Sequence, residues 1–316
     1  SFVNNEIGFS NQNVDALCRV TQSTKRKLKS KKTGEKGIGF KSVFQISDCP
    51  EIHSGDFHFK FNQGLDFGRV TPIWIEHKPS SRRAITEFIL RLSSNEKAKR
   101  IFQESKKEIK ADTLVFLKQI EEICIEDVTS RSKKIFRKTI SEGSKARSKL
   151  VHIEEVRSCS PNKKRECDYL VFEQEIVVDD INELERQGLR KAPLAIALPF
   201  MKDAGVDTDK GRDFYSFLPV GPGPFRFLLN GDFVLTGNRE QIQEDKEWNQ
   251  KLRDSIHKVL VNTILFAQKN KVKYFESMML FLEPTVNGLV FFDEVLPDAI
   301  ELLKEEKCIL TTEGKW

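Results

Sequence analysis

The stretch from residue 34 to residue 44 decides the fold, and it runs Gly34-Glu35-Lys36-Gly37-Ile38-Gly39-Phe40-Lys41-Ser42-Val43-Phe44. Its closely spaced glycines let backbone N–H groups approach an anion, because no Cβ atom blocks the way. Phe40, Val43 and Phe44 follow at helical spacing, and a helix that begins there adds the positive end of its dipole. The stretch therefore predicts a phosphate-binding loop in front of a helix. Glycines that serve only a tight turn are the alternative for a glycine cluster taken alone.

Two common phosphate-binding loops do not fit these letters. A Walker A loop requires G-x-x-x-x-G-K-[ST], whereas Phe40 follows the last glycine here and a basic run, not a strand, precedes the loop. A dinucleotide-binding fingerprint requires a third glycine where this chain has Ser42. Both loop types are excluded.

Outward from the loop, apolar spacing predicts a mixture of helices and strands. Ser10 is a helix-capping residue type, and it precedes a first helix. Ser54-Gly55-Asp56 is typical of a hairpin turn, and the residues after it alternate between Phe and polar side chains. The elements expected in this part are a helix over 11–20, strands over 57–61, 72–76 and 86–92, and helices over 95–110 and 114–120.

The remainder of the chain predicts a mostly antiparallel sheet with Pro/Gly turns, followed by a long amphipathic helix over 246–268. The strands expected are 133–140, 150–156, 169–178, 194–198 and 225–229. Both halves mix helix with sheet, so we expect an α+β chain. The boundary is expected near 122–130, which divides the chain into domains 1–125 and 126–316.

Composition narrows the class of protein. At ~150 residues per domain, 316 residues correspond to about two domains. Lys and Arg total 52 against 47 Asp and Glu, and this net charge of +5 is too mild to predict a nucleic-acid partner by itself. Apolar runs stay short of the ~18 residues that cross a bilayer, and no signal peptide opens the chain, so we expect a soluble protein without a membrane partner. Six cysteines without a C-x-x-C pair favour a cytoplasmic or nuclear location, and the histidines lack metal-ligand spacing.

Several motifs in a fixed order resemble the Bergerat ATP-binding fold of the GHKL superfamily, which includes gyrase, heat-shock-ninety chaperones, histidine kinases and mismatch-repair ATPases. These motifs are Asn4-Asn5-Glu6-Ile7-Gly8-Phe9, Ser23-Thr24-Lys25, the loop from Gly34 to Ser42, and a later strand with Thr86. The text from Gly34 through Ser54 is similar to the branch that contains sacsin and the plant protein NO VEIN. So are three later stretches, 217–220, 230–240 and 248–250.

The resemblance implies an N-terminally truncated Bergerat-type α/β sandwich that binds ATP, followed by a transducer-like α+β domain with long C-terminal helices. Asn4 stands where the superfamily has an aspartate that binds adenine, and Thr86, with Thr113 as a rival, matches the threonine that supports it. Arg239 is the candidate for a basic residue that senses the γ-phosphate; an ordinary surface arginine is the alternative. The remaining binding residues implied are Gly8, Thr24, Lys25, Lys36, Gly37, Ile38, Gly39, Phe40 and Lys41.

The superfamily's glutamate base and Mg²⁺-binding asparagine lie on a helix before the Asn4 strand, and this chain starts after the place of that helix. No other motif supplies the pair, so we assign no catalytic or metal-binding residue in this chain. We expect ATP as the ligand and Mg²⁺ held from outside this chain. The sequence is then either a fragment of a longer ATPase or a relative that does not hydrolyse ATP.

Two other functions are open. A degenerate scaffold that keeps the fold without binding nucleotide is favoured by Asn4 and by Glu6, which replaces a usual glycine. A nucleic-acid binder would use the basic run 25–36, but 24 Phe against three Tyr and three Trp argue against base stacking. The partners expected are therefore ATP and protein clients or other domains of a larger chain.

Overall fold

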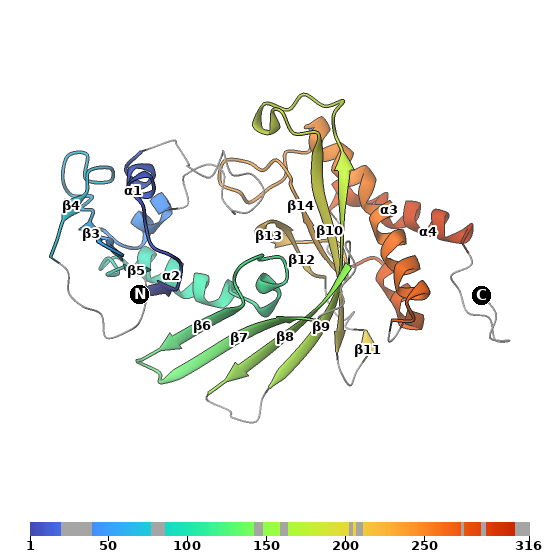
Figure 1. Cartoon of the computed structure of the whole chain (residues 1–316), viewed down its shortest axis with the longest axis horizontal. Helices are drawn as coiled ribbons and strands as arrows, with labels where there is room; N and C mark the ends of the chain where they lie inside the picture. The colour runs from blue at the N-terminus through green and yellow to red at the C-terminus, as the bar shows by residue number, and fades with distance from the viewer. Residues whose placement is uncertain are drawn as a thin grey trace. The chain divides into compact units, whose positions relative to one another are not determined.

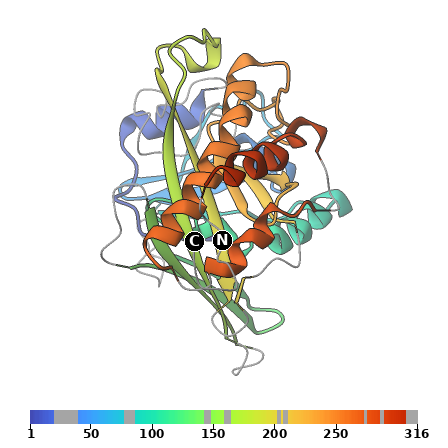
Figure 2. The ribbon, with the colours of Figure 1, turned by 90° about the vertical axis from the view of Figure 1, so that its right-hand side faces the viewer.

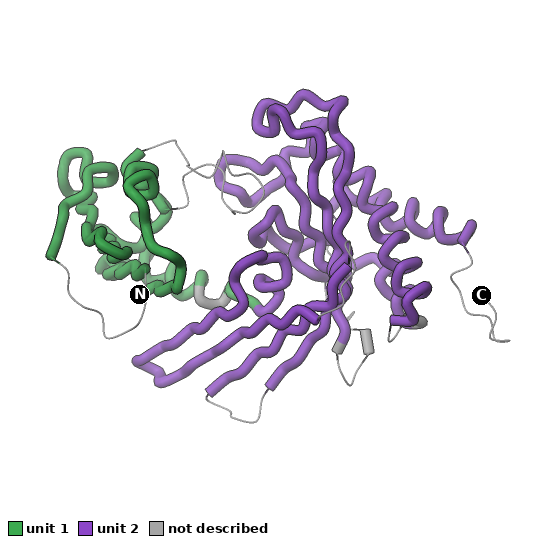
Figure 3. Tube along the Cα trace, viewed as in Figure 1, with its two compact units in different colours: residues 1–110 green, residues 111–316 purple. Residues whose placement is uncertain are grey.

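The computed structural model describes residues 1–19, 40–76, 86–141, 148–158, 164–201, 205–206, 211–272, 275–285 and 289–306. It divides the chain into two compact units, residues 1–110 and 111–316 (Figure 3). The chain is α+β, as the sequence predicts. No helix within the described ranges is long and apolar enough to cross a membrane.

The first unit contains a five-stranded antiparallel sheet in the order β1-β5-β2-β3-β4. Figure 1 labels β3, β4 and β5 of this sheet. Its strands are β1 (Phe2–Asn4), β2 (Glu51–Ser54), β3 (Phe57–Lys60), β4 (Ile73–Trp74) and β5 (Thr86–Ile89). Its helices are α1 (Asn11–Cys18), the 3-10 helix η2 (Phe40–Gln45) and α2 (Glu96–Glu108). A helix does begin directly after the glycine-rich loop, but it is a 3-10 helix of six residues.

The hairpin of β2 and β3 builds the core of this unit. Gly55 lies in the turn with φ +57°, a left-handed conformation that glycine adopts without strain, so the predicted turn is confirmed. Ile52 and Phe59 are directly opposite each other in the register and are fully buried. They pack with Val14 of α1 and Phe44 of η2. The alternating Phe residues therefore direct one face of the hairpin onto the helices.

The second unit is built on a curled, mostly antiparallel sheet in the order β13-β12-β14-β10-β9-β8-β7-β6, with β11 beside β10. One pair, β12 with β14, is parallel, so the sheet is mixed. The strands are β6 (Glu122–Asp127), β7 (Ser132–Ile140), β8 (Ser148–Arg157), β9 (Arg165–Val177), β10 (Lys191–Met201), β11 (Gly205–Val206), β12 (Asp213–Ser216), β13 (Leu218–Pro222) and β14 (Leu228–Gly231). The predicted antiparallel sheet is thus confirmed.

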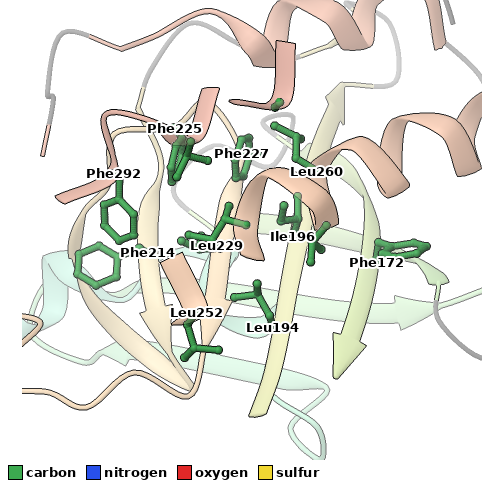
Figure 4. Packing of buried hydrophobic residues seen from close by; sticks show 14 of the residues in the cluster. Phe172, Leu194, Ile196, Phe214, Phe225, Phe227, Leu229, Leu252, Leu260 and Phe292 are labelled. Carbon is green, nitrogen blue, oxygen red and sulfur yellow. The ribbon is translucent and has the colours of Figure 1, made fainter. Parts of the chain in front are cut away.

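Helices cover one face of this sheet (Figure 2). They are α3 (Glu247–Lys269), α4 (Val295–Lys304) and the 3-10 helices η5 (Phe275–Leu282) and η6 (Val290–Phe292). Leu252 and Leu260 of α3 meet Leu194 and Ile196 of β10 in the shared core (Figure 4). The long helix predicted over 246–268 is confirmed, because its four-residue apolar spacing matches one continuous buried stripe.

The segment between the two units differs from the sequence prediction. The helix expected over 114–120 is wrong: a short 3-10 helix, η3 (Ala111–Leu114), is followed by turns, and β6 begins at Glu122. Leu114 and Val115 are buried because this segment packs against β7 and β8, not because they line a helix face. The units therefore divide at 110/111, whereas the division expected at residue 125 falls inside β6. The strand expected over 225–229 begins at Leu228.

Candidate functional site

Two of the predicted binding residues, from stretches far apart in the sequence, lie side by side in the first sheet. Asn4 of β1 is directly opposite Thr86 of β5. On the other side of β5, Thr86 is directly opposite Ser54 of β2. The strand order therefore sets Thr86 between an amide side chain and a second hydroxyl.

Ser54 and Thr86 form a buried hydroxyl pair. Their oxygens, Oγ and Oγ1, are 2.6 Å apart, and the two residues are 1% and 0% exposed. The backbone N–H of Phe9 donates to Ser54 Oγ at 2.8 Å. Sequence reasoning missed Ser54 as a site residue, because its position before Gly55 indicated a turn. Only the pairing of β2 with β5 reveals the contact.

The segment after β1 turns back toward this pair. The N–H of Glu6 donates to Asn4 Oδ1 at 3.3 Å, and Asn4 is exposed. Gly8 has φ +89°, in the left-handed region that favours glycine. Phe9 then directs its N–H at Ser54 and packs its ring on Phe88 with centroids 6.1 Å apart. Gly8 thus supplies the turn that fixes this segment beside Thr86.

Lys41, a predicted phosphate partner, is held by backbone carbonyls. Its Nζ donates to Leu17 O at 2.6 Å and to Arg69 O at 2.5 Å. Burial lowers the pKa of Lys41, and nearby Cys18 offsets this in part. An ammonium group has three donors, so two are used inside the fold. Leu17 belongs to the last turn of α1, so Lys41 also stabilises the carbonyl end of that helix.

Phe40, the other predicted binding residue of the loop motif that the structure describes, contributes its ring to the core. The ring lies 5.4 Å from Phe61 and 6.2 Å from Phe88, centroid to centroid. The other predicted residues of the Ser23–Lys25 motif and of the glycine-rich loop lie outside the described residues: Thr24, Lys25, Lys36, Gly37, Ile38 and Gly39. Their roles in holding phosphate stay predictions.

Arg239 lies in the second unit, in a tight turn. Its backbone has φ +65°, and its Nη2 donates to Ser216 O at 3.0 Å. Thr236 closes the turn, since its N–H donates to Gln241 O at 2.9 Å and its Oγ1 donates to Asn238 Oδ1 at 2.7 Å. The sensor role of Arg239 stays a prediction.

The motif stretch that precedes this turn is fastened to α3. Trp248 Nε1 donates to Asp232 O at 2.8 Å, and Asn249 bonds both the N–H and the carbonyl of Val234 at 2.8 Å. Arg186 Nη2 lies 2.8 Å from Asp232 Oδ1 in a buried ion pair. These residues therefore hold the loop onto the helix.

A histidine pair lies on the β2–β3 hairpin. His53 Nε2 is 2.9 Å from Glu51 Oε1, and His53 Nδ1 is 3.1 Å from His58 Nδ1. Burial raises the pKa of Glu51, but hydrogen bonds from His53 and Arg91 outweigh it, so the net shift is downward. Within the described ranges, no group of three or more His, Cys, Asp or Glu side chains is arranged to hold a metal ion.

Comparisons with known proteins agree with the predicted branch. Residues 2–62 match the family model described as the Sacsin domain. The chain is 29% identical over 344 residues to Protein NO VEIN of Arabidopsis thaliana, with 98% of this chain and 12% of that protein covered. The chain is thus a distant homologue of NO VEIN that spans about 12% of its length. The matched family segment contains Asn4, Gly8 and Ser54 and ends before Thr86.

Proposed function

We propose that this chain is the ATP-binding module of a chaperone-like protein of the sacsin and NO VEIN type. The observation that carries the proposal is the meeting of Asn4 and Thr86 on adjacent strands. The resemblance implies that both residues contact adenine, and a shared adenine site requires that they lie close together, as this register pair does. The Sacsin-domain match and the homology to NO VEIN support the same branch.

The side chains beside Thr86 fit the base of a nucleotide. Asn4 Oδ1 accepts from Glu6, so its Nδ2 hydrogens are directed to other acceptors. Thr86 adds a hydroxyl, and the rings of Phe9 and Phe88 supply apolar surface nearby. Pockets for planar cofactors combine such apolar walls with a few polar groups. Bound ATP would bring three phosphates, which the Gly34–Gly39 loop is proposed to hold.

The five-stranded antiparallel sheet with α1, η2 and α2 supports the proposal of a Bergerat-type sandwich. We propose that the second unit acts as its transducer and that Arg239 senses the γ-phosphate. We assign no described side chain as the general base or as the Mg²⁺ ligand. Hydrolysis would therefore require residues from outside this chain.

A calorimetric titration of the 316-residue chain with ATP and Mg²⁺ tests the proposal. We expect Thr86→Val to weaken ATP binding by roughly tenfold, because a buried hydrogen bond to the ligand is lost. Thr113→Val is the matched control, since Thr113 is the rival threonine and lies in the second unit. Absence of binding, both by this chain and by a longer one that includes the residues upstream of Ser1, would contradict the proposal.

The degenerate scaffold is the second candidate, and Lys41 favours it. A lysine whose ammonium donates to two backbone carbonyls already has a structural role. On this alternative Lys41→Met lowers stability and no variant affects a nucleotide, because none binds. The nucleic-acid alternative depends on the run 25–36, which lies outside the described residues.

A further inference from the structure

We propose that Ser54 is a positioning residue of the nucleotide site: it fixes the direction of the Thr86 hydroxyl and ties the Asn4–Phe9 segment to it. The inference rests on the proposed function, because it concerns the same site. It adds a residue that none of the site motifs contains. The contacts that carry it are the two hydrogen bonds of Ser54 Oγ.

Ser54 and Thr86 form a close pair across two strands. Ser54 and Thr86 are directly opposite each other on adjacent antiparallel strands, where facing side chains are in contact range. Both are buried, and their hydroxyl oxygens are 2.6 Å apart. In a buried environment a hydrogen bond is stronger than in water, and an unpaired hydroxyl is costly. The pair therefore holds both hydroxyls in place.

The two hydrogen bonds of Ser54 Oγ follow a direction that the Phe9 N–H sets. Ser54 Oγ accepts from the Phe9 N–H, which polarises the Ser54 O–H and makes it the better donor of the pair. We assign Ser54 as the donor to Thr86 Oγ1, which directs the Thr86 proton away from Ser54. The series from Phe9 to Ser54 to Thr86 then runs one way, and the Thr86 proton is left for a partner other than Ser54. Without Ser54, the Thr86 hydroxyl would rotate freely.

Ser54 is also linked to the other predicted binding residues of the first unit. Phe9 follows Gly8, whose φ of +89° turns the chain so that the Phe9 N–H faces Ser54. Asn4, at the other end of this segment, is paired with Thr86 through β1 and β5. Ser54 therefore connects the Asn4–Phe9 segment to Thr86 through its two hydrogen bonds. It acts through Thr86 and Phe9 and needs no contact with the ligand.

The test compares three ligands by calorimetry: ATP, GTP and inorganic tripolyphosphate. Ser54→Ala is expected to weaken ATP binding by about tenfold and to change the ratio of ATP to GTP affinity, because the direction of a donor near the base is lost. Tripolyphosphate binding is expected to change by less than about twofold, since it has no base. In a Thr86→Val background, Ser54→Ala should have little further effect on ATP, because the hydroxyl that it positions is already absent.

Ser47→Ala is the matched control. Ser47 is in the same unit, is 0% exposed, and its Oγ has no hydrogen-bond partner. This variant removes a buried serine hydroxyl of the same kind and should leave all three affinities unchanged. If Ser54→Ala does not fold, Ser54→Cys provides the second test, because a thiol of similar shape is a weaker donor. It should shift the ATP-to-GTP ratio in the same direction by a smaller factor.

The outcomes separate the two proposals. If the wild-type chain binds ATP and Ser54→Ala weakens all three ligands by one factor, Ser54 is only structural and the inference is overturned. Unchanged ATP binding by Ser54→Ala, alongside weakened binding by Thr86→Val, overturns it as well. If neither this chain nor a longer one binds ATP, the proposed function fails and the inference fails with it.

Discussion

The two motif-bearing regions of this chain use asparagine side chains in opposite ways. In the second unit, Asn249 accepts from Val234 N–H and donates to the carbonyls of Val234 and Gln243, each at 2.8 Å. All three of these hydrogen bonds of Asn249 are made to backbone groups inside the fold. In the first unit, Asn4 is exposed and has one longer contact, 3.3 Å from the Glu6 N–H. The comparison indicates that Asn249 maintains structure, whereas Asn4 is exposed, as the proposed nucleotide site requires.

The largest expected effect concerns the ion pair beneath the second region. Arg186 and Asp232 have side chains only 3% and 9% exposed and lie 2.8 Å apart. Arg186→Met should lower the free energy of unfolding by about 3–5 kcal/mol, because it leaves a buried carboxylate without its cation. Urea denaturation measures the change.

An exposed ion pair between β9 and β10 of the same unit provides the control for Arg186. Lys191 and Glu175 have side chains 59% and 68% exposed, 3.0 Å apart. Lys191→Met should cost less than about 1 kcal/mol, because solvent screens the pair. Equal losses in the two variants would show that burial does not distinguish them.

Asn249→Ala is the second test of the structural role assigned to the later motifs. It removes three hydrogen bonds and leaves the Val234 N–H and carbonyl without their partner, so we expect a loss of about 2–4 kcal/mol. Gln250→Ala, at the next position, removes one bond at 3.1 Å to Glu244 O and should cost less than about 1 kcal/mol. A loss no greater than that of Gln250→Ala would indicate that Asn249 is free for another role.

How much of this was visible in the sequence depends on how local each signal is. The helix α3 was predicted within one residue at each end (246–268 against 247–269), because its apolar spacing is a local property. The strand β6 was missed, since only Ile123 and Ile125 give it an apolar face and it lies at the edge of the sheet. The false helix over 114–120 arose from apolar residues that a neighbouring sheet buries.

The candidate site shows the same limit. Asn4 and Thr86 were found from motifs, but Ser54 was not, because its partner is 32 residues away and only strand register brings them together. Sequence spacing alone does not encode that register. Lys41 shows the reverse case: its place in a motif indicated a ligand contact, while its neighbours in space are carbonyls of α1 and of Arg69.

Two buried tyrosines of the second unit offer a smaller test of buried polar groups. Tyr169 OH donates to Asp112 Oδ1 at 2.5 Å, whereas Tyr215 OH is buried without a hydrogen-bond partner. Tyr169→Phe should cost about 1–2 kcal/mol, and Tyr215→Phe should be neutral or slightly stabilising. Urea denaturation at neutral pH measures both. A larger loss for Tyr215→Phe would show that its hydroxyl has a partner, such as a bound water.

The pKa shifts of the same two tyrosines predict that the folded chain loses stability at alkaline pH. Burial, followed by the charge of Asp112, raises the pKa of Tyr169 and of Tyr215 above the ordinary value of 10.0. The unfolded chain therefore loses these protons first, and stability falls as the pH rises above about 10. The fall should be smaller in Tyr169→Phe than in the wild type. Equal slopes in unfolding midpoints between about pH 9 and pH 11 would contradict this assignment.

The smallest effect is expected at His257, on the face of α3 that meets α4. Its Nδ1 has no hydrogen-bond partner and lies 3.8 Å from Asp298 Oδ2, with the side chain 13% exposed. Burial lowers the pKa of His257 below 6.5, and Asp298 offsets this in part. The unfolded chain therefore binds this proton first as the pH falls, so stability is lost below about pH 6.5. His257→Gln should show a shallower loss than the wild type between about pH 8 and pH 5.5, while the carboxylates titrate equally in both proteins. A loss of the same size in both would mean that the contact with Asp298 fully compensates the burial of His257.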